Sequence, residues 1–354
     1  MKKVKWAGVF AVATALMTSA ALAATNVSSS PSSTGKQHAR TRVTIMVGGM
    51  SKIIYSAATL AKVLGYYEKA GIDVYPIDEP AGGDATTALV SGQVDGAMGY
   101  YNHTVDVASK GKQVECVVQI GVTPGHAVMV PPNSSIKSAK DWKGKTLGIT
   151  ETGSSTDFEL QYIAKRAGVN ADQFTRLGVG AGATFIAALQ HGQIDGGITS
   201  QPTIGRLVSS GQAKIAIDLQ NLKETKAAFG GTFPSTCMYM RNDYVKAHPD
   251  AVQKLVNAYV WTLKWVASHS ATQFTDKMPA DYVGTDRALY IQDVEASKTF
   301  WATNGIMPKD GPPTILKFLS TFNPTVASAK INLSQTYTNR FVLKALKSKA
   351  PAAR

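Results

Sequence analysis

A chain of 354 residues with 44% hydrophobic and 17% charged residues can bury a large core and is long enough for two domains. Its formal net charge of +13 does not indicate a nucleic-acid-binding protein, because the lysines are scattered and form no basic helix or basic–aromatic repeat. We interpret the positive balance as attraction for small anions or as an aid to solubility.

The N-terminus has the pattern of a secretory signal peptide. Three lysines within the first five residues precede an apolar run over 6–22, which ends in small residues at Ala21–Ala23. No Cys follows this site, which argues against a lipid anchor. We predict cleavage near Ala23, a periplasmic mature protein, and a disordered Ser/Thr-rich lead over 24–42. The alternative is a retained membrane anchor, for which the apolar run is short.

From Val43 onward, predicted strands alternate with predicted helices. The first half reads, in order, RVTIMVGG, SKIIYSAATLAKVLGYYEKAG, IDVYPIDE, GGDATTALVSG, VDGAMGY, NHTVDVASKG and VECVVQIG. After an irregular stretch, PPNSSIKSAKDWKG, the second half repeats the order with KTLGIT, SSTDFELQYIAKRAG, FTRLGVG, GATFIAALQHG, QIDGGITS, PTIGRLVSSG and AKIAIDL. Strands separated by helices of about ten residues predict parallel sheets with crossover helices.

One helix-to-strand junction occurs twice in the sequence. TALVSGQVDGAMGY in the first half matches AALQHGQIDGGITS in the second, with Gly92 and Gly192 at the same place. We predict that both glycines are left-handed helix caps and that Asp95 and Asp195 begin the following strands. The repeat indicates two similar α/β domains.

The chain then returns to its first domain. STCMYMRNDYV is a further strand where the second domain is already complete, and the rest is mainly helical. We predict crossings near 125–135 and 222–236. Lobe 1 would then comprise 43–128 and 232–354, and lobe 2 would comprise 129–231. The predicted class is α/β, with two hinged lobes and a cleft between them.

The chain contains the segments GGMSKIIYSAATLAKVLGYYEKAGIDV, GQVDGAMGYYNHTVDVASKGK, DWKGKTLGITETGSSTDFELQYIAKRAGV, ALQHGQIDGGITSQP, HPDAVQKLVNAYVWTLKWV, DYVGTDRALY and YTNRFV. In their order and spacing, these segments resemble the substrate-binding proteins of nitrate/sulfonate/taurine-type ABC importers, a superfamily that includes thiamine-pyrimidine-synthase-like proteins. The resemblance implies a type II periplasmic binding protein fold with parallel or mixed sheets, a small-molecule ligand in the cleft, and ABC permease membrane subunits as partners. Family ligands include nitrate, alkanesulfonates, taurine and thiamine pyrimidine precursors. We expect a monomer.

Ligands of open α/β sheets bind beyond the carboxyl ends of the strands. Five loops satisfy this rule and supply the predicted ligand-binding residues, which are Met50, Ser51, Tyr101, Asn102, His103, Gly153, Ser154, Ser155, Thr156, Ser200, Gln201, Thr232 and Phe233.

The GSST stretch has the most specific chemistry. A helix that begins there offers free N–H groups, a partial positive charge and hydroxyl donors, which suit a carboxylate, sulfonate or phosphate. Ser155 or Thr156 could instead be a simple helix cap, and His103 could likewise only cap a helix. Tyr100 and Tyr101 are adjacent, so we expect one of them in the cleft and the other in the core. We expect His126 to be a solvated residue near the first crossing.

We predict no catalytic residues, no cofactor and no metal site. No hydrolase triad, phosphate loop or dinucleotide fingerprint occurs in the sequence. Cys116 and Cys237 are too few and too separated for a metal cluster, and both a disulfide and two free thiols fit them. The alternatives to a transport protein are a periplasmic sensor subunit and a pyrimidine synthase. The synthase branch has a clustered cysteine motif that this chain lacks.

Overall fold

The computed structural model describes residues 40–354; the predicted signal peptide and nearly all of the predicted lead lie outside this range. The first of two five-stranded sheets is mainly parallel, with one antiparallel strand. Its order is β2 (Ile72–Asp78), β1 (Thr41–Val47), β3 (Gly96–Tyr100), β10 (Thr236–Arg241) and β4 (Val114–Gln119). β1 begins at Thr41, inside the predicted lead, because Thr41 and Arg42 pair with Ile72 and Asp73 of β2.

The second sheet has the same plan. Its order is β7 (Thr175–Gly178), β6 (Thr146–Ile149), β8 (Gly196–Ser200), β5 (His126–Val130) and β9 (Lys214–Asp218). In each sheet the fourth strand runs antiparallel to both neighbours, and each of these two strands, β5 and β10, follows a crossing between the sheets. The predicted return of STCMYMRN to the first sheet is confirmed as β10. β5 was not predicted, and it is buried along its whole length.

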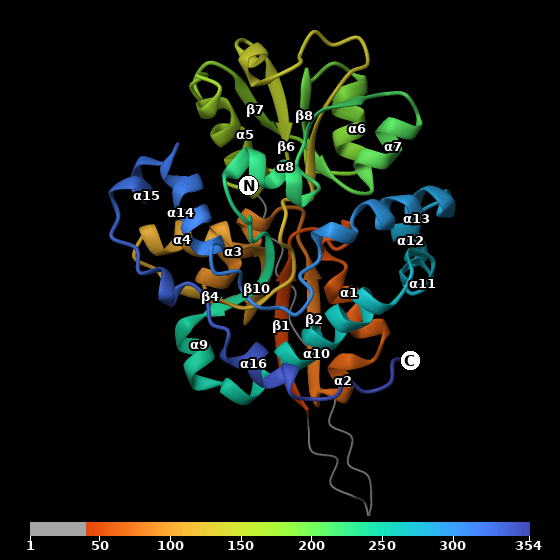
Figure 1. The fold of residues 1–354 in the computed structure, drawn as a ribbon, viewed down its shortest axis with the longest axis vertical. Coiled ribbons are helices and arrows are strands. Elements are labelled where there is room, and N and C mark those ends of the chain that lie inside the picture. Colours follow the sequence, from red (N-terminus) through yellow and green to blue (C-terminus); the bar gives the residue numbers. More distant parts are fainter. Residues whose placement is uncertain (1–39) are drawn as a thin grey trace, which may run out of the picture. The chain divides into compact units, whose positions relative to one another are not determined.

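Helices cover both sheets, as Figure 1 shows. Those of the two repeats are α1 (Ala57–Val63), α2 (Tyr66–Lys69), α3 (Gly82–Val90), α4 (Asn102–Ser109), α5 (Ser155–Arg166), α6 (Ala183–Gln190), α7 (Thr203–Ser209) and α8 (Leu222–Phe229). The C-terminal helices are α9 (Asn242–Ala247), α10 (Pro249–Ser268), α11 (Ala271–Thr275), α12 (Ala280–Val283), α13 (Arg287–Ala296), α14 (Gly311–Ser320), α15 (Pro324–Ser328) and α16 (Arg340–Leu346). Short 3-10 turns η1–η4 lie at Ile53–Tyr55, Ala139–Trp142, Lys298–Phe300 and Leu333–Gln335.

The long helix predicted after β1 is divided into η1, α1 and α2. Gly65 adopts φ 73° and ends α1, because a left-handed residue cannot continue a right-handed helix. α10 packs on α1, α2 and α16 through a face that includes Val252, Leu255 and Tyr259. No helix between residues 40 and 354 is long and apolar enough to cross a membrane.

The repeated junction has one structure in both sheets. Gly92 and Gly192 follow α3 and α6 with φ 82° and 67°, so both predicted left-handed caps are confirmed. Asp95 precedes β3, accepts a hydrogen bond from the backbone N–H of Thr44 at 2.8 Å and donates its own N–H to the Thr44 carbonyl. Asp195 makes the same two bonds with Thr146. Each aspartate therefore fixes a strand beside its parallel neighbour, and the repeated motif is structural.

The chain passes between the sheets at 120–125 and again at 230–235. The first crossing is earlier than predicted, because the strand HAVMV already belongs to the second sheet, and the expected boundary after residue 128 falls inside β5. In this crossing the Val122 N–H donates to the Phe300 carbonyl at 2.8 Å, which ties it to the C-terminal helices. The second crossing lies within the predicted range.

Candidate functional site

A small cavity lies between the two lobes, where residues at the carboxyl ends of β1, β3 and β6 come together with the start of β5. It is lined by Gly48, Lys52, Ile54, Tyr55, Gly82, Tyr100, His126, Thr150, Ser154, Ser155 and Thr156. Its volume is about 20 Å³, room for roughly one water molecule. The lobes are therefore in close contact in this structure.

Lys52 is the cationic residue of the cavity wall. Its side chain is buried, and its Nζ donates to the carbonyl oxygens of Gly48 and Pro80 at 2.8 Å each. Burial lowers the pKa of Lys52 to about 8, and the nearby carboxylate of Asp78 opposes this shift. Gly49 adopts φ 111°, and a Cβ there would collide with the Lys52 side chain, so the glycine makes room for the lysine.

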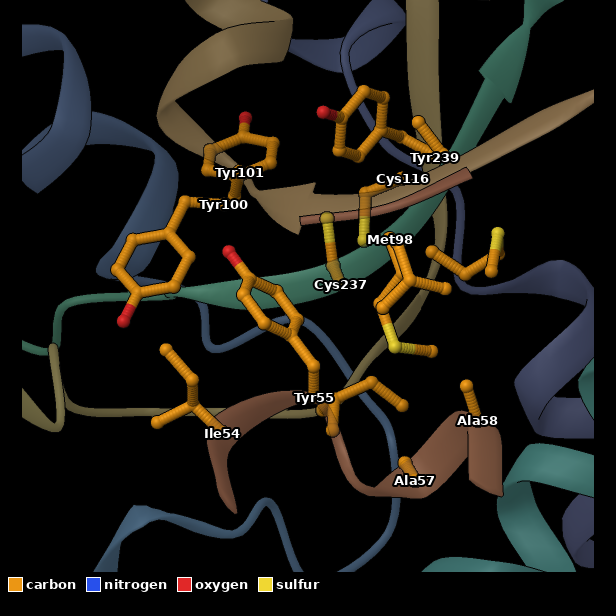
Figure 2. Close-up of a cluster of buried hydrophobic side chains, with 14 of the residues drawn as sticks. Ile54, Tyr55, Ala57, Ala58, Met98, Tyr100, Tyr101, Cys116, Cys237 and Tyr239 are labelled. Atoms are coloured by element: carbon orange, nitrogen blue, oxygen red, sulfur yellow. The ribbon is translucent and has the colours of Figure 1, made fainter. Parts of the chain in front are cut away.

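Two tyrosines give the cavity an aromatic wall. Tyr55 and Tyr100 are both buried, with ring centroids 6.3 Å apart. The Tyr100 hydroxyl donates to the Pro124 carbonyl, whereas the Tyr55 hydroxyl makes no hydrogen bond to any described residue. Figure 2 shows that the adjacent rings of Tyr100 and Tyr101 diverge, so only Tyr100 lies beside Tyr55.

His126 is not the solvated residue that we expected. It is 5% exposed, its ring stacks on Tyr100 with 5.2 Å between centroids, and its Nδ1 lies 2.9 Å from Oε2 of Glu159. Glu159 lies on α5 and is fully buried. His126 begins the unpredicted strand β5 and pairs with Ser200 at the end of β8. Its side chain therefore enters the interior beside that end of the strand.

The start of α5 supplies most of the polar wall from lobe 2. Ser154 is the N-cap, and its hydroxyl accepts from the Asp157 N–H. Ser154, Thr156 and Thr150 form a ring of hydroxyl contacts of 2.7–2.9 Å. The backbone N–H groups of Ser155 and Thr156 make no hydrogen bond to residues 40–354. The predicted helix-start chemistry is thus present, together with the capping role that we kept as its alternative.

Ser155 connects the two lobes. Its hydroxyl donates to Oδ1 of Asn102 at 2.9 Å and lies 3.2 Å from Nε2 of His103. Burial lowers the pKa of His103 to about 4, with a smaller opposing effect of Asp106, so the ring is neutral near pH 7. Because the serine proton is given to Asn102, Nε2 of His103 has to carry the proton that Ser155 accepts. Nδ2 of Asn102 is buried without a partner among the described residues.

A second hollow of about 520 Å³ lies beside the cavity, between α3, α4 and the turn before α5. His103 and Gly153 line it, with Phe158 and Asn323. The residues Ser154, Ser155 and Thr156 thus line the inner cavity, and His103 and Gly153 line the outer hollow. Asn102 lines neither and contacts the cavity wall through its hydrogen bond with Ser155.

Other predicted ligand-binding residues are not brought to the cavity wall. Tyr101 turns into the core, where its hydroxyl meets Thr336, because the last residue of β3 and the next one point to opposite sides. Phe233 packs between Phe229 and Phe318, at centroid distances of 4.5 and 5.1 Å. Thr232 donates its N–H to Asp310.

Met50 and Ser51, which come from the loop predicted after β1, do not line the cavity, although the neighbouring Lys52 does. Met50 donates its N–H to Asp78 and is half-buried, and Ser51 is exposed. Ser200 and Gln201 are buried at the end of β8, and the Gln201 carbonyl accepts from the Ile53 N–H at 3.1 Å. Gln201 therefore joins the lobes through its backbone.

Sequence reasoning missed Lys52, Tyr55, Tyr100 as the cavity tyrosine, His126, Thr150 and Glu159. Lys52 and Tyr55 directly follow the predicted GGMS loop, so extending that loop by one helical turn would have included them. His126 could have been found from HAVMV, whose composition is typical of a buried strand. Nothing in the sequence connects Glu159 with His126.

Cys116 and Cys237 are both buried free thiols on the neighbouring strands β4 and β10. Figure 2 shows their sulfur atoms in the core beneath Tyr101 and Tyr239. Among residues 40–354, no three His, Cys, Asp or Glu side chains gather as a metal site requires.

A family model described as NMT1/THI5 like matches residues 55–272, more than half of the chain. The chain belongs to the NMT1/THI5-like family. A curated relative, the 4-amino-5-hydroxymethyl-2-methylpyrimidine phosphate synthase of Schizosaccharomyces pombe, is 27% identical over 205 residues, which make up 56% of this chain and 58% of the relative. The chain thus spans less than two thirds of that relative's length.

Solved structures share the fold over most of their length. One from Bordetella bronchiseptica RB50 has 33% identity and a TM-score of 0.83, over 86% of this chain and 97% of that one. The alkanesulfonate-binding protein SsuA from Xanthomonas axonopodis pv. citri, bound to MOPS, has 16% identity and a TM-score of 0.68, over 84% and 98% of the two chains. The predicted family resemblance and the two-lobed periplasmic binding protein fold are confirmed.

Proposed function

We propose that this NMT1/THI5-like protein is a periplasmic solute-binding protein of an ABC importer. It captures a small anionic organic solute, of the sulfonate, carboxylate or aromatic acid class, between its lobes. The observation that carries the proposal is the start of α5, where two free backbone N–H groups and three hydroxyls face a cavity closed by the other lobe. Such a helix start favours an anion.

The contacts between the lobes support capture by closure. The bond from Ser155 to Asn102 and the backbone bond from Ile53 to Gln201 both join residues of opposite sheets. The cavity of about 20 Å³ is too small for an organic solute in this structure, so the solute would enter while the lobes are apart. Closure around the solute would then display both lobes to the permease membrane subunits. We expect the protein to act as a monomer.

The aromatic wall favours a flat organic acid over a bare inorganic anion. Tyr55 offers a hydroxyl that has no hydrogen-bond partner within residues 40–354, and Tyr100 offers a ring that already stacks on His126. Buried tyrosine combines a large apolar surface with one polar group, which suits a ring carrying an acid.

Native mass spectrometry followed by a thermal-shift panel tests the proposal. The panel holds sulfonates, carboxylates, aromatic acids, pyrimidines and nitrate. We expect at least one anion to raise the melting temperature, since a ligand at 100 times its Kd adds about 2.7 kcal/mol to the free energy of unfolding. The shift should fall in Ser155→Ala and persist in the control Ser328→Ala, an exposed serine on α15. No shift with any anion would contradict the proposal.

A second candidate is an enzyme, because the S. pombe relative is named a pyrimidine phosphate synthase. Its test is the chemical fate of a bound compound. A binding protein releases the compound unchanged on denaturation, and mass spectrometry of the released material would show a converted product if the protein were an enzyme. A periplasmic sensor subunit would bind the same ligand but would pull down a receptor in place of the permease.

A further inference from the structure

We infer that Lys52 is the charge partner of the bound anion and holds it from lobe 1, opposite the start of α5 in lobe 2. This inference rests on the proposed function, because it names the second anchor of the same site. It also defines the ligand class more narrowly, as a compound whose buried acid group carries one negative charge.

Two backbone carbonyl oxygens hold the ammonium group of Lys52. An ammonium group has three donors in a fixed arrangement. Two of them are used by the Gly48 and Pro80 carbonyls, both at 2.8 Å, which hold the nitrogen in place. Lys52 lines the cavity, so its remaining donor is available to a solute there.

Lys52 has no ion-pair partner in the part of the chain that the structure describes. None of the ion pairs among residues 40–354 includes Lys52, although its side chain is buried. Asp78 accepts from the Met50 N–H at 2.6 Å, and Glu159 is held by His126. A buried charge without a partner is costly, and an anion beside it removes that cost.

Lys52 and the start of α5 line the same cavity from opposite lobes. Lys52 comes from the loop after β1, and the start of α5 comes from the other lobe, yet both line a cavity of about 20 Å³. Closing the protein therefore brings an ammonium and the positive end of a helix to one place, where they repel. An anion between them turns this repulsion into two attractions, so the charge of the solute favours closure.

The wall of the cavity suits an acid group that carries a single negative charge. Lys52 is the sole Lys or Arg among the residues that line the cavity, and the Glu159 carboxylate adds negative charge nearby. A dianion would meet one full positive charge and a partial one. A neutral amide would leave Lys52 without a counter-ion. We expect both to bind more weakly than the monoanion.

Burial lowers the pKa of Lys52 to about 8 and the Asp78 carboxylate offsets this only in part, which agrees with an ammonium that no ion pair holds. An anion beside it favours the charged form and raises the pKa of Lys52. Binding above pH 8 should then take up a proton, and the affinity for the anion should fall as the pH rises.

The first experiment needs no ligand. NMR of protein carrying lysine labelled at its side-chain carbons follows the lysine signals as a function of pH, and Lys52→Arg identifies the signal that disappears. We expect that signal to titrate at least one pH unit below about 10.4, the ordinary value for a lysine side chain. An ordinary titration would overturn the inference whether or not a ligand is known.

The second experiment compares matched acid and amide probes, benzoate with benzamide and nicotinate with nicotinamide, together with methanesulfonate and inorganic phosphate. Affinity is measured for the wild type, Lys52→Met, Lys52→Arg and the control Lys62→Met, whose lysine is exposed on α1. We expect Lys52→Met to lose roughly 10- to 100-fold in affinity for the acid, the range for a hydrogen bond to a charged group, and to lose its preference over the amide. Lys52→Arg should retain part of that preference.

The outcomes separate the two proposals. An acid that binds the wild type and Lys52→Met equally would overturn the role of Lys52 and leave a solute-binding protein. A probe set that binds in no form would count against the proposed function, and the ligand-free titration would still decide on Lys52. An amide that binds as tightly as its acid would contradict both the charge requirement and the anionic ligand class.

Discussion

Nδ1 of His126 lies 2.9 Å from Oε2 of Glu159, and both side chains are buried. His126 is the first residue of β5, directly after the first crossing between the sheets, and Glu159 lies on α5. The pair therefore fixes the helix whose start faces the cavity to the point where the chain enters lobe 2.

Breaking this pair should destabilise the protein strongly. Glu159→Ala should lower the free energy of unfolding by roughly 3–5 kcal/mol, because it leaves a buried histidine without its partner. Glu159→Gln keeps an acceptor and should cost less. Urea unfolding measures the loss. Glu295→Ala is the matched control, since its partner Lys298 is exposed and such pairs contribute about 1 kcal/mol or less. Equal effects of the two alanine variants would contradict the assignment.

Alanine substitutions of the two neighbouring serines at the start of α5 should have different effects on stability and on ligand affinity. Ser154 is the N-cap, so Ser154→Ala should cost about 1 kcal/mol in stability. Ser155 instead joins the lobes through Asn102 and His103, so Ser155→Ala should weaken ligand affinity about tenfold with a smaller effect on stability. Calorimetry with the strongest panel compound and urea unfolding distinguish the two. A reversed pattern would exchange the roles.

Asp95 and Asp195 offer the same test in two places. Each accepts a hydrogen bond from a strand N–H at 2.8 Å, so each alanine variant should cost about 1–2 kcal/mol, and each asparagine variant less. Hydrogen exchange should show local loss of protection, at Thr44 in β1 for Asp95→Ala and at Thr146 in β6 for Asp195→Ala. Loss in the wrong sheet would refute the structural reading of the repeat.

Asp293 should make stability depend on pH. Burial raises the pKa of Asp293 to about 7, while Arg206 opposes the shift and Asp286 adds to it. Its Oδ2 is buried without a partner in the described chain. Because the folded-state pKa is the higher one, the contribution of Asp293 to stability is complete below about pH 4 and is lost as the pH rises through 7.

Asp293→Asn should therefore be more stable than the wild type at pH 8, by roughly 2 kcal/mol, and should differ little at pH 4. Melting temperatures measured from pH 4 to pH 8 follow the difference. Asp281→Asn, at an exposed position of α12, is the control. A constant difference across the pH range would show that Asp293 keeps its charge in the folded protein.

The regular alternation of the chain was sufficient to predict the five strands of the first sheet, including the returning β10, and four of the five strands of the second. Periodicity failed where the backbone departs from it for a local reason. Gly65 interrupts an otherwise continuous helical pattern after β1. The five residues of β5 directly follow the turn signal Pro124–Gly125, but they were taken as part of the crossing and not recognised as a strand.

For the candidate site, the helix start at Ser154–Thr156 could be predicted, since a helix end and its free N–H groups follow from local sequence. Lys52 and His126 lie next to local signals that could have led to them, but their burial and their contacts depend on the packed structure and do not follow from local sequence. The direction of a side chain at a strand end also decided between Tyr100 and Tyr101, and the sequence left that choice open.

The position of β10 has a consequence for how the protein is made. β10 lies between β3 and β4 and pairs with both, so these two strands are joined into one sheet only after residues 236–241 have been made. The second sheet, by contrast, is formed entirely by 126–218 and can assemble from a contiguous stretch. During synthesis, lobe 2 can thus be complete while the first sheet still has two open edges. Its closure joins strands more than a hundred residues apart, which slows the last folding step and keeps the chain unfolded longer.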